Sequence, residues 1–391
     1  MENPPVHFFI SGKEKKVLPG SKLWEFPLSG KRTHGKSGLK SGTVSQGTQI
    51  TIGDFFSAAW QAISNKEDSI LMAGLEAVFQ RPVSGEDIHC ISVFLEKHGA
   101  FYHPLKIKVD LKESQTLLFV LNGAVSKPGL ALIETEYYLI SRLNKIFSKQ
   151  YLPRVFGLNI LKTNHGRIGF FLGEWFENYK EFHITDGQGQ RQIVIWESDG
   201  GCRYLPVVNA LPIYREISRI LTAYYNIETF EQIFPWHHAA GDFIVKQIGG
   251  QFHVRLITVR GYSSLTDFGS GESDIKIHIL PSLLFFFFNL TLRMRLDRLD
   301  GTGKIVWLGD EVLGATVEGF LTALDEKSKD YNHGDLKMSI IAFVKGWSLD
   351  QVMNIMVTLI EPYDISPTEN RLIMENLETH CRVLEGIFKT F

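Results

Sequence analysis

The segment Pro235-Trp-His-His-Ala-Ala-Gly-Asp-Phe-Ile-Val-Lys246 constrains the fold of this chain more than any other. A Gly-Gly pair and a second apolar run, residues 254–260, follow it. A polar loop, a short apolar run, a glycine turn and another apolar run predict a β-hairpin that begins in a loop rich in side chains. The histidines and the aspartate at positions 237, 238 and 242 make this loop the first candidate for chemistry.

The overall composition is that of an ordinary globular protein. The chain has 391 residues, of which 44% are hydrophobic and 21% are charged. Its net charge of −2 gives no electrostatic reason to expect nucleic acid or a membrane as partner. The three cysteines, Cys90, Cys202 and Cys381, are far apart and show no metal-binding spacing. Together with a start that lacks a signal-peptide pattern, they predict a cytoplasmic protein.

The order of expected elements predicts an α+β fold with two lobes. Residues 1–48 are expected to form an irregular basic arm, and residues 49–104 a helical extension with apolar residues at helical spacing from 52 to 79. Strands and an amphipathic helix at 134–147 predict a strand-rich lobe over 105–177. The remainder, 178–391, predicts a helical lobe that includes the hairpin at 235–260. The apolar run 275–292 is interrupted by Lys276, His278, Pro281 and Asn289, so we expect a buried helix and not a membrane span.

Several segments occur in the order found in protein-kinase-like phosphotransferases. A strand at 118–125 precedes a helix that carries Glu134 and Glu136. A strand at 170–175 resembles the hinge that borders the adenine site and ends near Glu174. A long helix at 211–225 then precedes the loop and hairpin at 235–260. Over residues 105–300 the chain resembles this family, and the aminoglycoside-type kinases more than signalling kinases. The resemblance implies a cleft between two lobes that binds ATP and Mg²⁺.

The hairpin departs from the family pattern at its chemical positions. The family has H-x-D-x-x-x-x-N before the first strand and a metal-binding Asp after the second. By alignment, Pro235 takes the place of the first His, His237 that of the catalytic Asp, and Asp242 that of the Asn. Thr258 takes the place of the second metal-binding Asp. The resemblance therefore implies that Asp242 is a metal ligand and that Thr258 borders the cofactor.

The first lobe shows a similar departure. The lysine that contacts the nucleotide phosphates aligns with Asn122, whereas the acid that holds this lysine aligns with Glu136. No glycine-rich phosphate cover precedes the strand. With Glu174 at the hinge, the resemblance implies a nucleotide site bordered by Asn122, Glu136, Glu174 and Thr258, but one that lacks its usual charges.

Three functions remain open on the sequence. The first is a non-catalytic, pseudokinase-like protein that binds a nucleotide, a small ligand or a partner protein. The second is an atypical phosphotransferase that uses Asp242 as metal ligand and His237 or His238 as base. The third is a metal-dependent enzyme, because imidazole and carboxylate also suit zinc, iron or manganese. The missing charges favour the first.

Two other patterns compete with these interpretations. Residues 30–37 match G-x-x-x-x-G-K-[ST], but a proline precedes the match and a poor helix former follows it, which favours a flexible basic loop. The charged run with Arg293, Arg295, Asp297 and Arg298 predicts a solvated or interlobe ion-pair network. A more specific but less favoured alternative is an anion-binding site formed by Arg293 and Arg295.

Overall fold

The computed structural model describes residues 4–12, 15–28, 50–64, 69–96, 101–187, 189–197, 200–238, 241–265, 276–301, 303–360 and 366–391. The chain divides into two compact units, which are described separately. The first contains Met1–Lys145 and Pro153–Glu177, and the second contains Ile146–Leu152 and Asn178–Phe391. The division after Glu177 lies at the position where the sequence analysis separated the two lobes.

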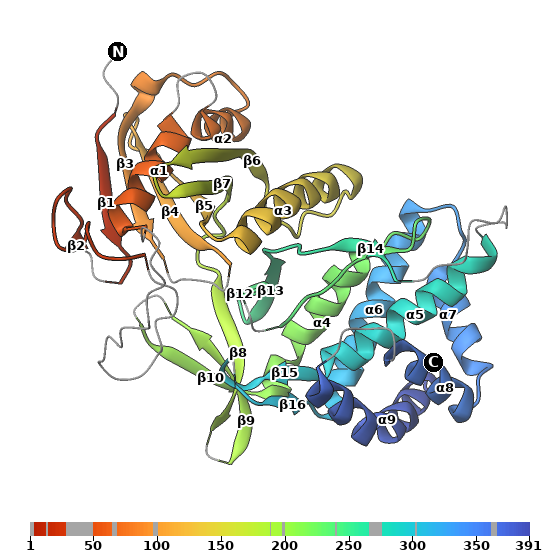
Figure 1. Cartoon of the computed structure of the whole chain (residues 1–391). Coiled ribbons are helices and arrows are strands. Elements are labelled where there is room, and N and C mark those ends of the chain that lie inside the picture. Colours follow the sequence, from red (N-terminus) through yellow and green to blue (C-terminus); the bar gives the residue numbers. More distant parts are fainter. Residues whose placement is uncertain are drawn as a thin grey trace. The chain divides into compact units, whose positions relative to one another are not determined.

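The first unit is built on a sheet of seven described strands in the order β2-β1-β3-β4-β5-β7-β6 (Figure 1). All neighbours pair antiparallel except β1 and β3, which are parallel. Strand β4 shows why these residues form a sheet: Leu105, Ile107 and Val109 are fully buried and alternate with polar residues. The strands are β1 (Val6–Ile10), β2 (Lys15–Lys16), β3 (Ile88–Leu95), β4 (His103–Leu111), β5 (Thr116–Ala124), β6 (Val155–Thr163) and β7 (Gly166–Glu174).

Three α-helices accompany this sheet in the described part of the first unit: α1 (Ile52–Ser64), α2 (Ile70–Phe79) and α3 (Lys127–Ile146). The helical spacing from 52 to 79 is thus confirmed, as two helices. Helix α1 begins with a reciprocal pair: Thr51 N–H and hydroxyl donate to Asp54, while Asp54 N–H donates to the Thr51 hydroxyl. A short 3₁₀ turn, Gly85–Asp87, leads into β3.

The N-terminal part of the chain differs from the expectation at two places. Val6–Ile10 is a strand of the sheet and not part of an irregular arm, because this short apolar run pairs with β3. Likewise β3 lies within the segment expected to be a helical extension, and its pairing with β4 joins residues 49–104 to the same unit as 105–177. Local composition at 1–48 did not reveal a pairing that depends on a distant strand.

The second unit also contains a sheet, of which the sequence analysis anticipates only the hairpin at 235–260. Its five described strands lie in the order β10-β9-β8-β12-β13, all antiparallel. They are β8 (Lys180–Gly187), β9 (Gln190–Trp196), β10 (Cys202–Pro206), β12 (Phe243–Ile248) and β13 (Gln251–Leu256). Two short ladders complete the set, β11 (Glu231–Ile233) with β14 (Tyr262–Ser264), and β15 (Leu296–Arg298) with β16 (Ile305–Trp307). A 3₁₀ turn, Leu299–Gly301, follows β15.

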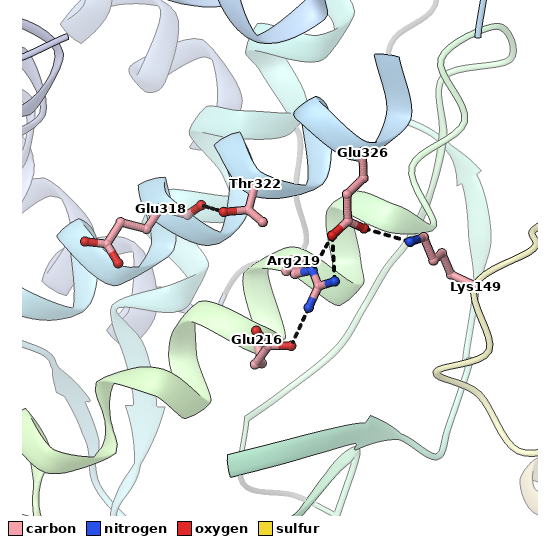
Figure 2. Close-up of polar contacts among 6 residues, drawn as sticks. All are labelled: Lys149, Glu216, Arg219, Glu318, Thr322 and Glu326. Atoms are coloured by element: carbon pink, nitrogen blue, oxygen red, sulfur yellow. Dashed lines mark hydrogen bonds and ion pairs between the residues drawn. The ribbon is translucent and has the colours of Figure 1, made fainter. Parts of the chain in front are cut away.

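Six α-helices make up the rest of the described second unit (Figure 1). One contact between α4 and α6 is an ion network shown in Figure 2: Arg219 donates to Glu326 at 2.6 and 3.1 Å, and Lys149 reaches the other Glu326 oxygen at 3.0 Å. The helices are α4 (Val207–Ala223), α5 (Lys276–Met294), α6 (Asp310–Asp330), α7 (Leu336–Lys345), α8 (Leu349–Ile360) and α9 (Pro367–Phe388). The α+β class, with a strand-rich N-terminal region and a helical C-terminal region, is confirmed.

Helix α5 contains the run of four phenylalanines. Among the described helices it alone is long and apolar enough to cross a membrane by itself, and the bent pair α7 and α8 passes the same test only when taken together. Within its most apolar window, 67% is buried inside the protein. Phe287 and Phe288 are fully buried, and Phe287 packs against Phe320 of α6 with ring centroids 4.4 Å apart. Core packing therefore accounts for its apolar composition.

Candidate functional site

The predicted loop and hairpin at 235–260 are present in the second unit. Strand β11 leads through a cis Phe234–Pro235 bond into the loop, and β12 and β13 then pair from Phe243–Leu256 to Ile248–Gln251. The turn consists of Gly249 and Gly250, both with positive φ (57° and 84°). Two adjacent residues with positive φ match the twist of a two-residue hairpin, which explains the glycine pair.

A close backbone approach holds the two ends of this region together. Phe234 N–H donates to the Gly261 carbonyl at 3.2 Å, just beyond the β11–β14 ladder. A Cβ atom on Gly261 would lie 2.5 Å from the Phe234 carbonyl oxygen, so a side chain does not fit there. The loop is thus a closed structure, entered at Phe234 and left at Gly261.

Asp242 lies at the centre of this closed structure and is fully buried. Its carboxylate accepts four hydrogen bonds: from His237 N–H at 2.8 Å, from the Thr258 hydroxyl at 2.7 Å, and from both Nη atoms of Arg260. The Asp242 carbonyl also accepts from Ile257 N–H at 2.8 Å. This last bond extends the hairpin ladder and brings Thr258 and Arg260, two residues apart, to the same carboxylate.

The charged state of Asp242 follows from these contacts. Burial disfavours the carboxylate, but the hydrogen bonds from His237, Arg260 and Thr258 outweigh it, and the pKa of Asp242 lies below its ordinary value of 3.8. The neighbouring guanidinium supplies a full positive charge at contact distance. At neutral pH the site is therefore a buried ion pair whose carboxylate oxygens are all engaged.

The predicted residues of the loop divide into two groups. His237, Asp242 and Thr258 come together, with the His237 Nδ1 atom 3.7 Å from the carboxylate and its side chain 51% exposed. His238 points elsewhere: it is buried, and its ring packs against those of Tyr214 and Trp236. Burial, with a smaller effect of His237, lowers the pKa of His238 to about 3, so its imidazole is neutral at pH 7.

Asn122, Glu136 and Glu174 all belong to the first unit. Asn122 is a partly buried residue of β5, opposite Phe171 of β7. Glu136 is a buried residue of α3, 1% exposed. Glu174, at the end of β7, accepts from Arg154 N–H at 3.2 Å and lies 3.5 Å from its guanidinium. Their roles in a nucleotide site stay predictions.

The charged run at 293–298 is solvated only in part. Arg295 is 3% exposed and pairs with Asp310 at 2.7 Å, and Asp297 is 6% exposed. Arg293 and Arg298 instead share Glu369 of α9, at 3.7 and 3.0 Å. These residues pair with other elements because the chain leaves α5 at Met294 and enters β15, so the run does not continue as one helix.

Sequence reasoning missed Arg260, the residue that decides the electrostatics of the site. In the sequence Arg260 is the last residue of an apolar run, and its position two residues after Thr258 is the available signal. Among the described residues no group of three or more His, Cys, Asp or Glu side chains could hold a metal ion. The P-loop-like match at 30–37 lies outside the described residues.

Comparison with known proteins gives little further information. No family model matches the chain, and no curated protein matches it. Among solved structures, the PAN3 pseudokinase of Drosophila melanogaster is similar at 11% sequence identity and a TM-score of 0.27. The match covers 79% of this chain and 70% of that one. A superposition this loose assigns no role to any residue.

Proposed function

We propose that this chain is a non-catalytic, pseudokinase-like binding protein in which an internal arginine takes the place of the catalytic metal ion. The observation that carries the proposal is the contact between Arg260 and Asp242. Asp242 and Thr258 align with the two positions that hold magnesium in kinase-like enzymes, and here they are joined by a 2.7 Å hydrogen bond. The cation that neutralises Asp242 is the guanidinium of Arg260, which contacts both carboxylate oxygens.

The charge balance argues against a divalent ion at the same place. Phosphoryl transfer depends on metal ions that neutralise charge on the phosphates and are held by protein carboxylates. At this hairpin Asp242 is already neutralised and its oxygens accept four hydrogen bonds. A metal ion at Asp242 would have to displace Arg260, which would leave a partly buried guanidinium without its carboxylate.

The order of elements supports a kinase-like ancestry for this arrangement. Strand β5, helix α3 with a buried Glu136, and strands β6 and β7 follow one another in the first unit. Helix α4 then precedes the loop and the β12–β13 hairpin in the second. Asn122 stands at the position of the family's phosphate-binding lysine, so the second charge needed for phosphate binding is also replaced.

The atypical phosphotransferase is the weaker candidate. His238 is buried, and with a pKa of about 3 it is a poor base. His237 is the accessible imidazole of the pair, but the carboxylate beside it is already bound to Arg260. A metal-dependent enzyme at this loop is disfavoured for the same reason, because the Asp242 carboxylate that would bind the metal is already bound to Arg260.

The test measures ADP formation by the full chain with ATP and either Mg²⁺ or Mn²⁺, beside the Asp242→Asn variant. We expect both proteins to give the background rate of a sample without protein. The melting temperature with ATP is measured in parallel, once with EDTA and once with Mg²⁺. We expect ATP to change the melting temperature by the same amount in the two conditions. Metal-dependent ADP formation that Asp242→Asn abolishes would overturn the proposal.

A further inference from the structure

A small cavity of about 60 Å³ adjoins the loop within the second unit. It is bordered by the loop at 234–238, which includes His237, and by the charged run that begins at the end of α5. The residues that matter for its chemistry are Trp236, His238, Arg293, Asp297, Arg298 and Glu369. The cavity has room for a few water molecules or one small polar ion.

Two buried polar side chains line this cavity without satisfying their hydrogen-bonding capacity. His238 Nε2 and Asp297 Oδ2 have no hydrogen-bond partner among the described residues, although the side chains are 1% and 6% exposed. The other oxygen of Asp297 accepts from Arg298 N–H at 2.7 Å. Leaving a buried polar atom without a hydrogen bond is costly, so two at one cavity indicate a polar guest.

The other charged groups of the cavity favour an anion. Arg293 and Arg298 both pair with one carboxylate, that of Glu369, so these three side chains carry a net positive charge. Glu369 is in the first turn of α9, a helix of 22 residues, and a helix N-terminus adds a partial positive charge. The Arg298 side chain is 40% exposed, so it borders both the cavity and solvent.

We propose that this cavity binds a small phosphate-type oxyanion, either inorganic phosphate or the phosphate group of a small molecule. A monoprotonated or diprotonated phosphate has unprotonated oxygens for Arg293 and Arg298, and a P–O–H that donates to the buried His238 Nε2. An oxyanion without a proton, such as sulfate, satisfies the arginines but offers no donor to His238. The site should therefore prefer phosphate to sulfate.

This inference goes beyond the proposed function, because neither Arg260 nor Asp242 lines the cavity and its ligand needs no divalent metal. Titration calorimetry of the full chain with inorganic phosphate, sulfate and glycerol phosphate, at equal ionic strength and at about pH 6, tests it, because a phosphate monoester also keeps a P–O–H at that pH. We expect phosphate to bind at least tenfold more tightly than sulfate. Binding of glycerol phosphate as well would identify the phosphate group of a larger molecule as the ligand, whereas binding of inorganic phosphate alone would identify the free ion.

Two arginine variants complete the test. Arg298→Ala should weaken phosphate binding at least tenfold. Arg371→Ala is the matched control, since Arg371 is on the same helix as Glu369, is 69% exposed and pairs with Glu375 outside the cavity. It should bind like the unmodified chain. Absence of phosphate binding to the folded, unmodified chain, equal binding of sulfate, or unchanged binding by Arg298→Ala would each overturn the inference. None of these results depends on whether the chain hydrolyses ATP.

Discussion

The guanidinium of Arg260 contacts both carboxylate oxygens of Asp242, and the carboxylate is fully buried. The pair closes the loop between β11 and β14, since Asp242 also accepts from the backbone of His237 and from the side chain of Thr258. A contact of this kind fixes the loop and neutralises the buried carboxylate.

Removing one partner of this pair should be costly. In Arg260→Met we expect the free energy of unfolding to fall by about 3–5 kcal/mol, because a buried carboxylate loses its counter-ion. Urea denaturation followed by tryptophan fluorescence measures the change. The double variant Arg260→Met with Asp242→Asn removes both charges and should recover part of the loss. If Arg260→Met alone is as stable as the unmodified chain, the ion pair does not hold the loop.

The sequence predicted the hairpin well, because its signals are local. Apolar runs, two glycines and a polar loop determine the element type within about 25 residues, and Gly249 and Gly250 do form the turn. The strand and helix order of the first lobe was predicted for the same reason. Strand β1 was missed, since its pairing with β3 depends on residues more than 80 positions away.

The chemistry of the site was harder to predict than its frame. His237, Asp242 and Thr258 were expected to lie close together, and they do. The partner that fixes their charge, Arg260, was not identified, because no pattern in a sequence distinguishes an arginine that faces a buried carboxylate from one in solvent. Asp297 was misjudged similarly: its burial depends on the packing of β15 beside the loop at 234–238.

Glu326 connects α4, α6 and the segment that contains Lys149, and its loss should weaken the second unit. Burial opposes its charged form, but hydrogen bonds from Lys149 and Arg219 outweigh this and hold the pKa of Glu326 below 4.5. Glu326→Gln should lower the free energy of unfolding by about 1 kcal/mol at pH 7 and low salt. Because the folded pKa is lowered, this contribution is present above pH 4.5 and is lost as the pH falls below it.

The matched control for this variant is Glu318→Gln on the same helix. The Glu318 carboxylate is 65% exposed, and its distance of 4.0 Å from Arg215 is at the limit of an ion pair. Figure 2 shows the Glu318 side chain directed away from Arg219. We expect no measurable effect of Glu318→Gln. Equal effects of the two substitutions, in urea denaturation at low salt, would contradict a specific role for the network.

Lys327 should destabilise the protein at low pH. It is 4% exposed and its ammonium lies over the rings of Phe147 and Tyr331, at 5.1 and 5.2 Å. Burial lowers the pKa of Lys327 from 10.5 to about 7, against a smaller opposing effect of Asp330. The unfolded chain thus binds more protons between pH 7 and 10.5, and stability rises with pH over that range.

Replacing this lysine by an apolar residue removes the cost of burying its charge. Lys327→Met should raise the free energy of unfolding at pH 6 by on the order of 3 kcal/mol, and the gain should shrink toward pH 10. Lys329→Met, at an exposed position of the same helix, is the control and should show no such dependence. The prediction fails if the gain from Lys327→Met is the same at both pH values, as measured by urea denaturation.

Asp297 should show the opposite dependence on pH. Burial raises its pKa from 3.8 to about 7, although hydrogen bonding to Arg298 N–H and the nearby His237 oppose this. The other groups around it are the neutral His238, the buried phenol of Tyr214 and the Arg293–Glu369 pair at the cavity. The folded chain therefore holds a proton between pH 3.8 and 7 that the unfolded chain has lost, and stability falls as the pH rises through that range.

Asp297→Asn removes this titration and keeps the shape of the side chain. We expect it to raise the free energy of unfolding at pH 8, by about 4 kcal/mol at most, and to change it much less at pH 4.5. Asp186→Asn, at a carboxylate that is 60% exposed, is the control and should be neutral at both values. Phosphate that donates its proton to Asp297 at pH 8 would satisfy the buried carboxylate of the unmodified chain. Added phosphate should then reduce the difference in the free energy of unfolding between Asp297→Asn and the unmodified chain. An Asp297→Asn effect that is equal at pH 4.5 and pH 8 would mean that Asp297 is charged in the folded protein throughout this range.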